Sequence, residues 1–124
     1  MENFNIEGTL KTPSIILEAE KGRLEFSGRS IPENSPEFYR PVVEWVDHYL
    51  ENSPEQTTIT IKLEYFNTSS SKSLFEIFKK FEHIFKSGKQ VLVRWFYEQE
   101  DEDMRESGED FRDLLKIPFE LIVT

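Results

Sequence analysis

Two segments of the chain alternate apolar and polar residues with the period of two that is typical of a β-strand. They cover residues 58–66 and 90–97. The side chains expected to face the core are Ile59, Ile61, Leu63 and Tyr65 in the first, and Val91, Val93, Trp95 and Tyr97 in the second. Because only one face of each strand is strongly apolar, we expect helices to cover mainly one face of the sheet.

Two further segments repeat their apolar residues with the period of a helix. The first is predicted to span residues 36–51, with Ser35 as its N-cap and Pro36 in its first turn. The second begins after the polar run 67–71 and is predicted to end at Gly88. Their core positions are Phe38, Val42, Trp45, Val46, Tyr49 and Leu50 in the first helix, and Leu74, Ile77, Phe78, Phe81, Ile84 and Phe85 in the second.

The two ends of the chain add shorter elements. Residues 15–18 and 23–27 are predicted to form a β-hairpin whose turn contains Gly22, and Gly28 is predicted to end its second strand. Apolar residues near Phe111 indicate a short helix, and residues 119–123 form the last predicted strand.

These elements follow one another in the order β-β-α-β-α-β-α-β. Strands that alternate with helices favour parallel pairing, while the opening hairpin is antiparallel. We therefore predict an α/β fold with a mixed, mostly parallel sheet and helices mainly on one face. The length of 124 residues fits one domain, which we expect to span residues 1–124.

The charge of the chain is negative and unevenly distributed. The formal net charge is −9, and the segment 98–110 holds eight acidic residues against the single base Arg105. A surface of this sign repels phosphate backbones and anionic lipid, so we expect neither nucleic acid nor a membrane as a partner. We predict that the acidic segment is a solvated loop.

Several kinds of chemistry are excluded or disfavoured by the residues present. The chain has no cysteine, which removes disulfides, thiolate nucleophiles and cysteine metal ligands. It also lacks a run of about 20 apolar residues for a membrane span, and its first ten residues do not resemble a secretory signal. We expect a soluble, cytoplasmic protein without a cofactor or metal.

The candidate functional residues lie in the sequence Asn67-Thr68-Ser69-Ser70-Ser71, where a predicted strand ends and a helix begins. The start of a helix presents unpaired N–H groups and a partial positive charge, which stabilise a phosphoryl group. One of these hydroxyls is expected to serve as the N-cap, which is the commoner role of serine and threonine at this position. Only one cap is needed and four hydroxyls are present, so the excess also indicates a phosphorylation site.

Catalytic alternatives receive less support from the sequence. A serine nucleophile needs a base beside it, but there is no Gly-x-Ser-x-Gly pattern, and His48 and His83 lie within predicted helices. A calcium loop matches at Asp101 and Asp103 but is interrupted at Arg105. A small enzyme of another type stays open, and a polar pocket with converging carboxylates would support it.

Several short motifs together resemble the SiaC family of bacterial regulatory phosphoproteins, which are similar to STAS-type anti-sigma-factor antagonists. The resemblance covers nearly the whole chain. The motifs are Pro32-Glu33-Asn34-Ser35, Tyr65-Phe66-Asn67-Thr68-Ser69-Ser70, Arg94-Trp95 with Tyr97, and Phe111-Arg112 followed by Pro118-Phe119. The dense acidic run at 98–110 departs from the family pattern, and no role is predicted for it.

The resemblance implies a partner switch centred on Thr68. In that family a dedicated protein kinase phosphorylates the matching threonine, and a metal-dependent protein phosphatase reverses the reaction. The unmodified form binds and activates a diguanylate cyclase, which raises cyclic di-GMP and favours biofilm growth. The alternative function is a constitutive adaptor that binds its partner through the same surface without phosphorylation.

Residues around Thr68 are expected to form the surface that binds the partner. In a STAS-like arrangement the loop with Glu33 and Asn34 borders the Thr68 turn, so we predict that both contribute to the docking site. Asn34 and Ser35 are equally suited to simple capping of the first helix. The remaining predicted contact residues are Asn67, Ser69 and Ser70.

Overall fold

The strands of the sheet lie side by side in the order in which they occur in the chain. The computed structural model describes residues 1–124 and contains one six-stranded sheet of order β1-β2-β3-β4-β5-β6. Its elements are β1 (Phe4–Ile6), β2 (Ser14–Glu18), β3 (Arg23–Ser30), α1 (Ser35–Glu51), β4 (Gln56–Phe66), α2 (Thr68–Lys86), β5 (Gln90–Tyr97), α3 (Glu102–Leu114) and β6 (Phe119–Val123). None of the helices combines the length and the apolar character that crossing a membrane requires.

The pairing of the strands confirms the predicted mixed sheet. β1, β2 and β3 are antiparallel neighbours, whereas β3 through β6 are parallel. The predicted hairpin is formed by β2 and β3, and Gly22 in its turn has a φ of 63°, which favours glycine. β1 was not predicted, because three residues are too few to show an alternating pattern.

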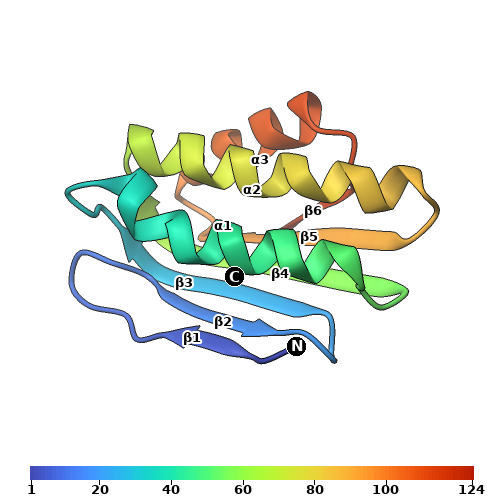
Figure 1. The fold of residues 1–124 in the computed structure, drawn as a ribbon. Coiled ribbons are helices and arrows are strands. Elements are labelled where there is room, and N and C mark those ends of the chain that lie inside the picture. The colour runs from blue at the N-terminus through green and yellow to red at the C-terminus, as the bar shows by residue number, and fades with distance from the viewer.

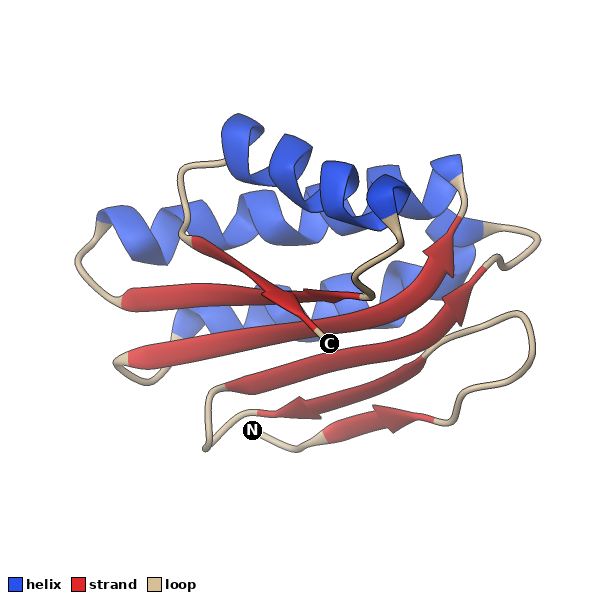
Figure 2. Cartoon of the chain, turned by 180° about the vertical axis from the view of Figure 1, so that it is seen from behind, coloured by secondary structure: helices blue, strands red, loops and turns tan.

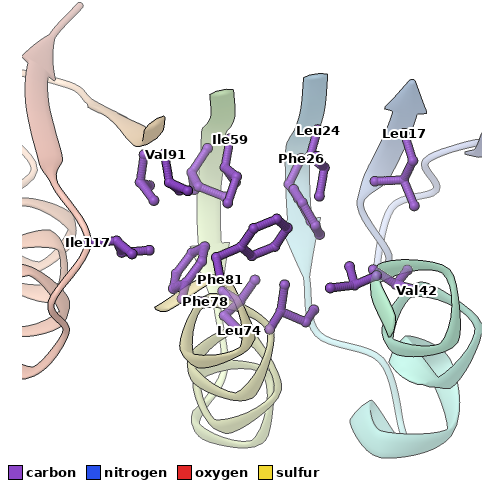
Figure 3. Packing of buried hydrophobic residues seen from close by; sticks show 14 of the residues in the cluster. Leu17, Leu24, Phe26, Val42, Ile59, Leu74, Phe78, Phe81, Val91 and Ile117 are labelled. Atoms are coloured by element: carbon purple, nitrogen blue, oxygen red, sulfur yellow. The ribbon is translucent and has the colours of Figure 1, made fainter. Parts of the chain in front are cut away.

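All three helices pack on the same face of the sheet, as Figures 1 and 2 show from opposite sides. The core lies between the two layers (Figure 3). Leu17 from the sheet lies opposite Val42 of α1, and Phe26 lies opposite Phe81 of α2; all four are fully buried. Because each such side chain contributes about 1.5–3 kcal/mol on burial, this layer supplies most of the driving force for folding.

Strand β4 contains a bulge that corrects one predicted core residue. Gly28 of β3 pairs with Leu63, but the next residue, Arg29, pairs with Tyr65, so that Glu64 is the extra residue in β4. An extra residue reverses the alternation of side chains beyond it. Tyr65, predicted to face the core, is therefore 51% exposed.

Phe66 packs inward in place of Tyr65. Its ring lies 5.9 Å from that of Trp95, between centroids, in an edge-to-face arrangement.

Gly28 has a φ of 93° and lies at the register shift. It does not end β3, as was predicted, because the strand continues to Ser30. Gly88 follows the end of α2 with a φ of 107°, which confirms its predicted role.

Most of the acidic segment is helical, so the prediction of a solvated loop was wrong. Helix α3 begins at Glu102, and the side chain of Asp101 caps it by accepting the Met104 N–H at 3.0 Å. Acidic residues in the first turn favour this helix, because they lie beside its partial positive charge. Met104, Gly108 and Phe111 form its buried face at helical spacing.

We expect the substitution Gly108→Ala to destabilise the fold through α3. A Cβ at this position would lie 2.6 Å from atoms of both Trp95 and Leu121, so the helix would have to move away from the sheet. Overpacking of this kind costs about 1–3 kcal/mol. Thermal denaturation followed by circular dichroism measures the change, with the exposed Glu106→Ala as the control. An unchanged melting temperature in both variants would contradict the close packing of α3.

A buried carboxylate fixes the loop between α3 and β6 to helix α2. Glu82 is 4% exposed and accepts the backbone N–H of Lys116 at 2.8 Å. Lys79 lies 2.9 Å from its other oxygen. Burial alone would raise the pKa of Glu82, but these hydrogen bonds and the charges of Lys79 and Lys86 outweigh it and lower the pKa.

This lowered pKa makes the stability of the fold depend on acidity. The ionised Glu82 stabilises the folded state above the unfolded pKa near 4.5, and this contribution is lost as the pH falls through the lower, folded pKa. We expect Glu82→Gln to reduce the free energy of unfolding at pH 7 and to flatten its dependence on pH below about 4.5. Urea denaturation from pH 3 to 7 checks both effects; parallel pH curves for parent and variant would contradict the assignment.

Candidate functional site

Two helices begin beside each other at one edge of the sheet. Because β3 and β4 are parallel, their ends lie together, with Ser30 paired to Phe66. The Asn67 N–H donates to the Ser30 carbonyl at 3.1 Å, which fixes the start of α2 against the end of β3. The starts of α1 and α2 therefore meet at this edge, on the left of Figure 1.

Helix α2 is capped by Asn67 and not by one of the hydroxyls that follow it. The Asn67 side-chain oxygen accepts the Ser70 N–H at 2.9 Å, and its backbone carbonyl accepts the Ser71 N–H. This corrects the prediction that the cap is a serine or threonine. Capping does not use the Thr68 hydroxyl, which is on the first residue of the helix and exposed.

The hydroxyls of the turn differ sharply in their surroundings. Ser69 is exposed and donates to the Ser35 hydroxyl at 2.9 Å, while Ser70 is completely buried. The burial of Ser70 argues against its predicted contact with a partner. Thr68 makes no side-chain hydrogen bond, so its hydroxyl is accessible to another protein.

A chain of buried hydroxyls lies beneath this surface. Tyr39 contacts Ser30 at 2.7 Å, Ser30 contacts Ser70 at 2.8 Å, and Ser35 contacts Ser70 at 3.1 Å, each measured between side-chain oxygens. The Ser70 hydroxyl also donates to the Ser30 carbonyl at 3.0 Å. The chain thus joins the end of β3 to the first turns of both helices.

The direction of each hydrogen bond in this chain follows from the number of protons. A hydroxyl has a single proton to donate and can accept twice. Since Ser70 donates to the Ser30 carbonyl, it must accept from both Ser30 and Ser35, and Tyr39 must donate to Ser30. Burial raises the pKa of Tyr39 to about 12, against a smaller lowering by its hydrogen bond to Ser30, so the phenol keeps its proton.

The loop before α1 lies next to the Thr68 turn. The hydrogen bond from Ser69 to Ser35 joins them, and Glu33 and Asn34 immediately before Ser35 are exposed. Asn34 is the N-cap of α1, since its side chain accepts the Glu37 N–H at 3.2 Å. This corrects the prediction of Ser35 as the cap. Capping uses one acceptor of Asn34 and leaves the rest of its side chain on the surface.

The surface around Thr68 is suited to an added negative charge. The first turn of α2 contains no acidic residue, in contrast to the first turn of α3. Free N–H groups and the helix dipole therefore act on a phosphoryl group there without an opposing carboxylate in the same turn.

The arrangement shows little that indicates catalysis. No group of three or more His, Asp or Glu residues is placed to hold a metal ion. His48 and His83 are exposed on the outer faces of their helices. A hollow of about 420 Å³ lies beside the site between α1 and α2, and Asn34, Arg40 and Glu76 are among its lining residues. Thr68 lies outside it.

Analysis of the sequence missed the two residues that hold the site from within, Ser30 and Tyr39. Ser30 and Ser70 are 40 positions apart, and no spacing rule connects them. The predicted apolar face of α1 included Phe38, but the structure buries Tyr39 and leaves Phe38 half-buried. The one signal that could have found Tyr39 is its phenol hydroxyl, which needs a hydrogen-bond partner when the side chain is buried.

We expect Ser70→Ala to destabilise the protein, because Ser30 and Ser35 would each keep a buried donor without an acceptor. The cost of such unsatisfied groups is about 1–3 kcal/mol each. Ser73→Ala is the matched control, since Ser73 lies on the same helix, is 7% exposed, and its side chain forms no hydrogen bond. Urea denaturation measures both variants. Equal losses of stability would contradict the assigned directions of the hydrogen bonds.

The fold and the site together define a STAS-like α/β domain that presents an accessible threonine at the start of a helix. The sequence model of the SiaC family of regulatory phosphoproteins matches residues 6–124. The chain belongs to this family. A protein of Pseudomonas aeruginosa strain UCBPP-PA14 is 35% identical over 119 residues, which are 96% of this chain and 94% of the relative.

Solved structures of the family agree with the fold. SiaC of P. aeruginosa has a TM-score of 0.92 and 33% sequence identity, with complete coverage of both chains. A second structure is that of the diguanylate cyclase SiaD in complex with its activator SiaC from P. aeruginosa. A chain of this complex matches with a TM-score of 0.91 and 34% sequence identity, and the match covers 98% of the present chain and 99% of the matched chain.

Proposed function

We propose that this protein is a phosphorylation-controlled activator of a diguanylate cyclase, and that phosphorylation of Thr68 releases the cyclase. The observation that carries the proposal is the exposed, unbonded hydroxyl of Thr68 at the start of α2. Membership of a family of regulatory phosphoproteins supports it, as does the crystallised complex of a family member with the cyclase that it activates.

The modification itself is a phosphoryl transfer in each direction. A protein kinase joins the γ-phosphorus of ATP to the Thr68 oxygen while the bond to ADP breaks, and the hydroxyl proton leaves to a base of the kinase. A metal-dependent phosphatase directs water at the same phosphorus and regenerates the hydroxyl and inorganic phosphate. This chain supplies only the accepting oxygen, so we assign it a regulatory and not a catalytic role.

The phosphoryl group acts on the partner through solvation and charge. A docked cyclase covers the Thr68 turn, and a group with a charge of about −1.5 to −2 loses its water there. A loss of about 1.4 kcal/mol in binding free energy already lowers the affinity tenfold. Because α2 stabilises the phosphate, the fold is retained while its surface changes.

The surface that binds the cyclase is proposed to include Glu33, Asn34, Asn67 and Ser69. Asn67 and Ser69 flank Thr68 in the sequence, and Glu33 and Asn34 directly precede Ser35, whose hydroxyl accepts from Ser69. We place the switch in the cytoplasm, where ATP is available to a kinase.

Substitution of Thr68 is expected to separate the two states. Thr68→Ala keeps the neutral surface and should bind the cyclase as the parent does, while resisting phosphorylation. Thr68→Asp adds a charge at the start of α2 and should weaken binding at least tenfold, or about 1.4 kcal/mol. Isothermal titration calorimetry with the purified cyclase measures binding, and formation of cyclic di-GMP measures activation.

The matched control is Ser71→Asp, which adds the same charge one turn along the same helix. It should leave binding closer to that of the parent than Thr68→Asp does. If Thr68→Asp, and the parent after incubation with kinase and ATP, bind the cyclase with unchanged affinity, the protein is a constitutive adaptor and the proposal fails.

A further inference from the structure

The buried hydroxyl chain runs from the surface beside Thr68 into the interior. Ser69 donates to Ser35, Ser35 donates to Ser70, and Ser70 donates to the Ser30 carbonyl. Only the first of these hydroxyls belongs to an exposed residue of α2, and it follows Thr68 directly in the sequence.

Ser35 is the point at which this chain meets the loop before α1. It is the first residue of that helix and is 1% exposed. The Ser35 hydroxyl accepts a hydrogen bond from Ser69 and donates one to Ser70. Both of its side-chain hydrogen bonds to α2 are therefore made with hydroxyl groups. These two bonds hold the residue that directly follows Glu33 and Asn34 to the first turn of α2.

We propose that a phosphoryl group on Thr68 draws the Ser69 hydroxyl away from Ser35 and thereby loosens the loop that carries Glu33 and Asn34. This inference rests on the proposed function and deepens it. Phosphorylation then changes the partner surface in two places, at Thr68 through charge and at the loop through the loss of one hydrogen bond. No proton is transferred, because the Ser69 hydroxyl only changes its acceptor.

The competition favours the phosphate for a simple reason. Ser69 has a single proton, and a hydrogen bond to an ionised oxygen is about twice as strong as one between neutral groups. The present partner is a neutral hydroxyl at 2.9 Å, and a second acceptor, the Asn67 side-chain oxygen, already lies at 3.4 Å. The Ser69 hydroxyl is therefore the member of the chain that is most easily redirected.

The size of the effect follows from the worth of one hydrogen bond. The loss of one neutral hydrogen bond corresponds to about a fivefold change in the local opening of the segment that it holds. Ser35 keeps its bond to Ser70, so α1 stays folded and the change is confined to its first turn.

Hydrogen exchange of backbone amides tests the coupling directly. The Glu37 and Phe38 N–H groups report on the loop, because they donate to the Asn34 side chain and carbonyl. Phosphothreonine is introduced at position 68 by genetic encoding, so that no kinase is needed. We expect both amides to exchange about fivefold faster in the phosphorylated protein than in the unmodified one.

Ser69→Ala provides the decisive variant. Without phosphate it should already show the faster exchange at Glu37 and Phe38, and phosphothreonine at position 68 should add nothing further. Ser71→Ala is the matched control and should respond to phosphate as the parent does. Amides in the middle of α2 should not change in any sample, which excludes a general loss of stability.

Two results would overturn the inference: unchanged exchange at Glu37 and Phe38 on phosphorylation of the parent, or an equal response in Ser69→Ala. Cyclase binding measured on the same samples tests the proposed function independently. If phosphate abolishes binding but leaves these amides unchanged, only the coupling through Ser69 is wrong. If phosphate leaves binding unchanged, the proposed function fails whatever the amides show.

Discussion

The parallel pairing of β3 with β4 is the constraint on which the site depends. Parallel neighbours end at the same edge of a sheet, and each is followed here by a helix that returns over the same face. This brings together the two helix starts, where Ser35 and Ser69 are 34 residues apart in the chain. Without this pairing the hydroxyls of Ser35 and Ser69 would not be brought within hydrogen-bond distance.

The junction between the helix starts is polar, whereas most of the buried residues of the domain are apolar. A buried hydroxyl that lacks a partner is costly, so this junction is stable in only the arrangement that satisfies every donor. The structure leaves no buried side-chain polar atom without a partner. Apolar side chains at the same place would tolerate small sliding of α1 against α2, whereas directional bonds hold one relative position.

Prediction from the sequence succeeded where a repeated pattern was long enough to read. The helices around Trp45 and Phe78 and the strands around Ile61 and Val93 were all identified, because each buries several residues at a regular spacing. Their order predicted the mixed, mostly parallel sheet, whereas the STAS-like arrangement and the candidate Thr68 came from the resemblance to the SiaC family. The parts that were wrong share a cause, since each depends on contacts between distant segments or on local charge placement.

Helix α3 shows this most clearly. Its composition is that of a solvated loop, but Met104 and Phe111 lie on one side of it and Asp101 is placed to cap it. Likewise, the choice of Asn67 over four hydroxyls as the cap of α2 is a matter of backbone geometry, which composition does not reveal. The chain from Tyr39 to Ser69 has no local signature, because its members come from three separate elements.

The bulge at Glu64 determines which face of the sheet the following residues of β4 lie on. Because one additional residue is accommodated there, Phe66 enters the interior and the chain reaches α2 with Asn67 positioned as a cap. Deletion of Glu64 would restore a regular ladder, because Leu63 and Tyr65 already pair with consecutive residues of β3, and it would leave Tyr65 outward and Phe66 inward. The bulge therefore accommodates one additional residue in β4 while Phe66, Asn67 and Thr68 keep their positions relative to the end of β3.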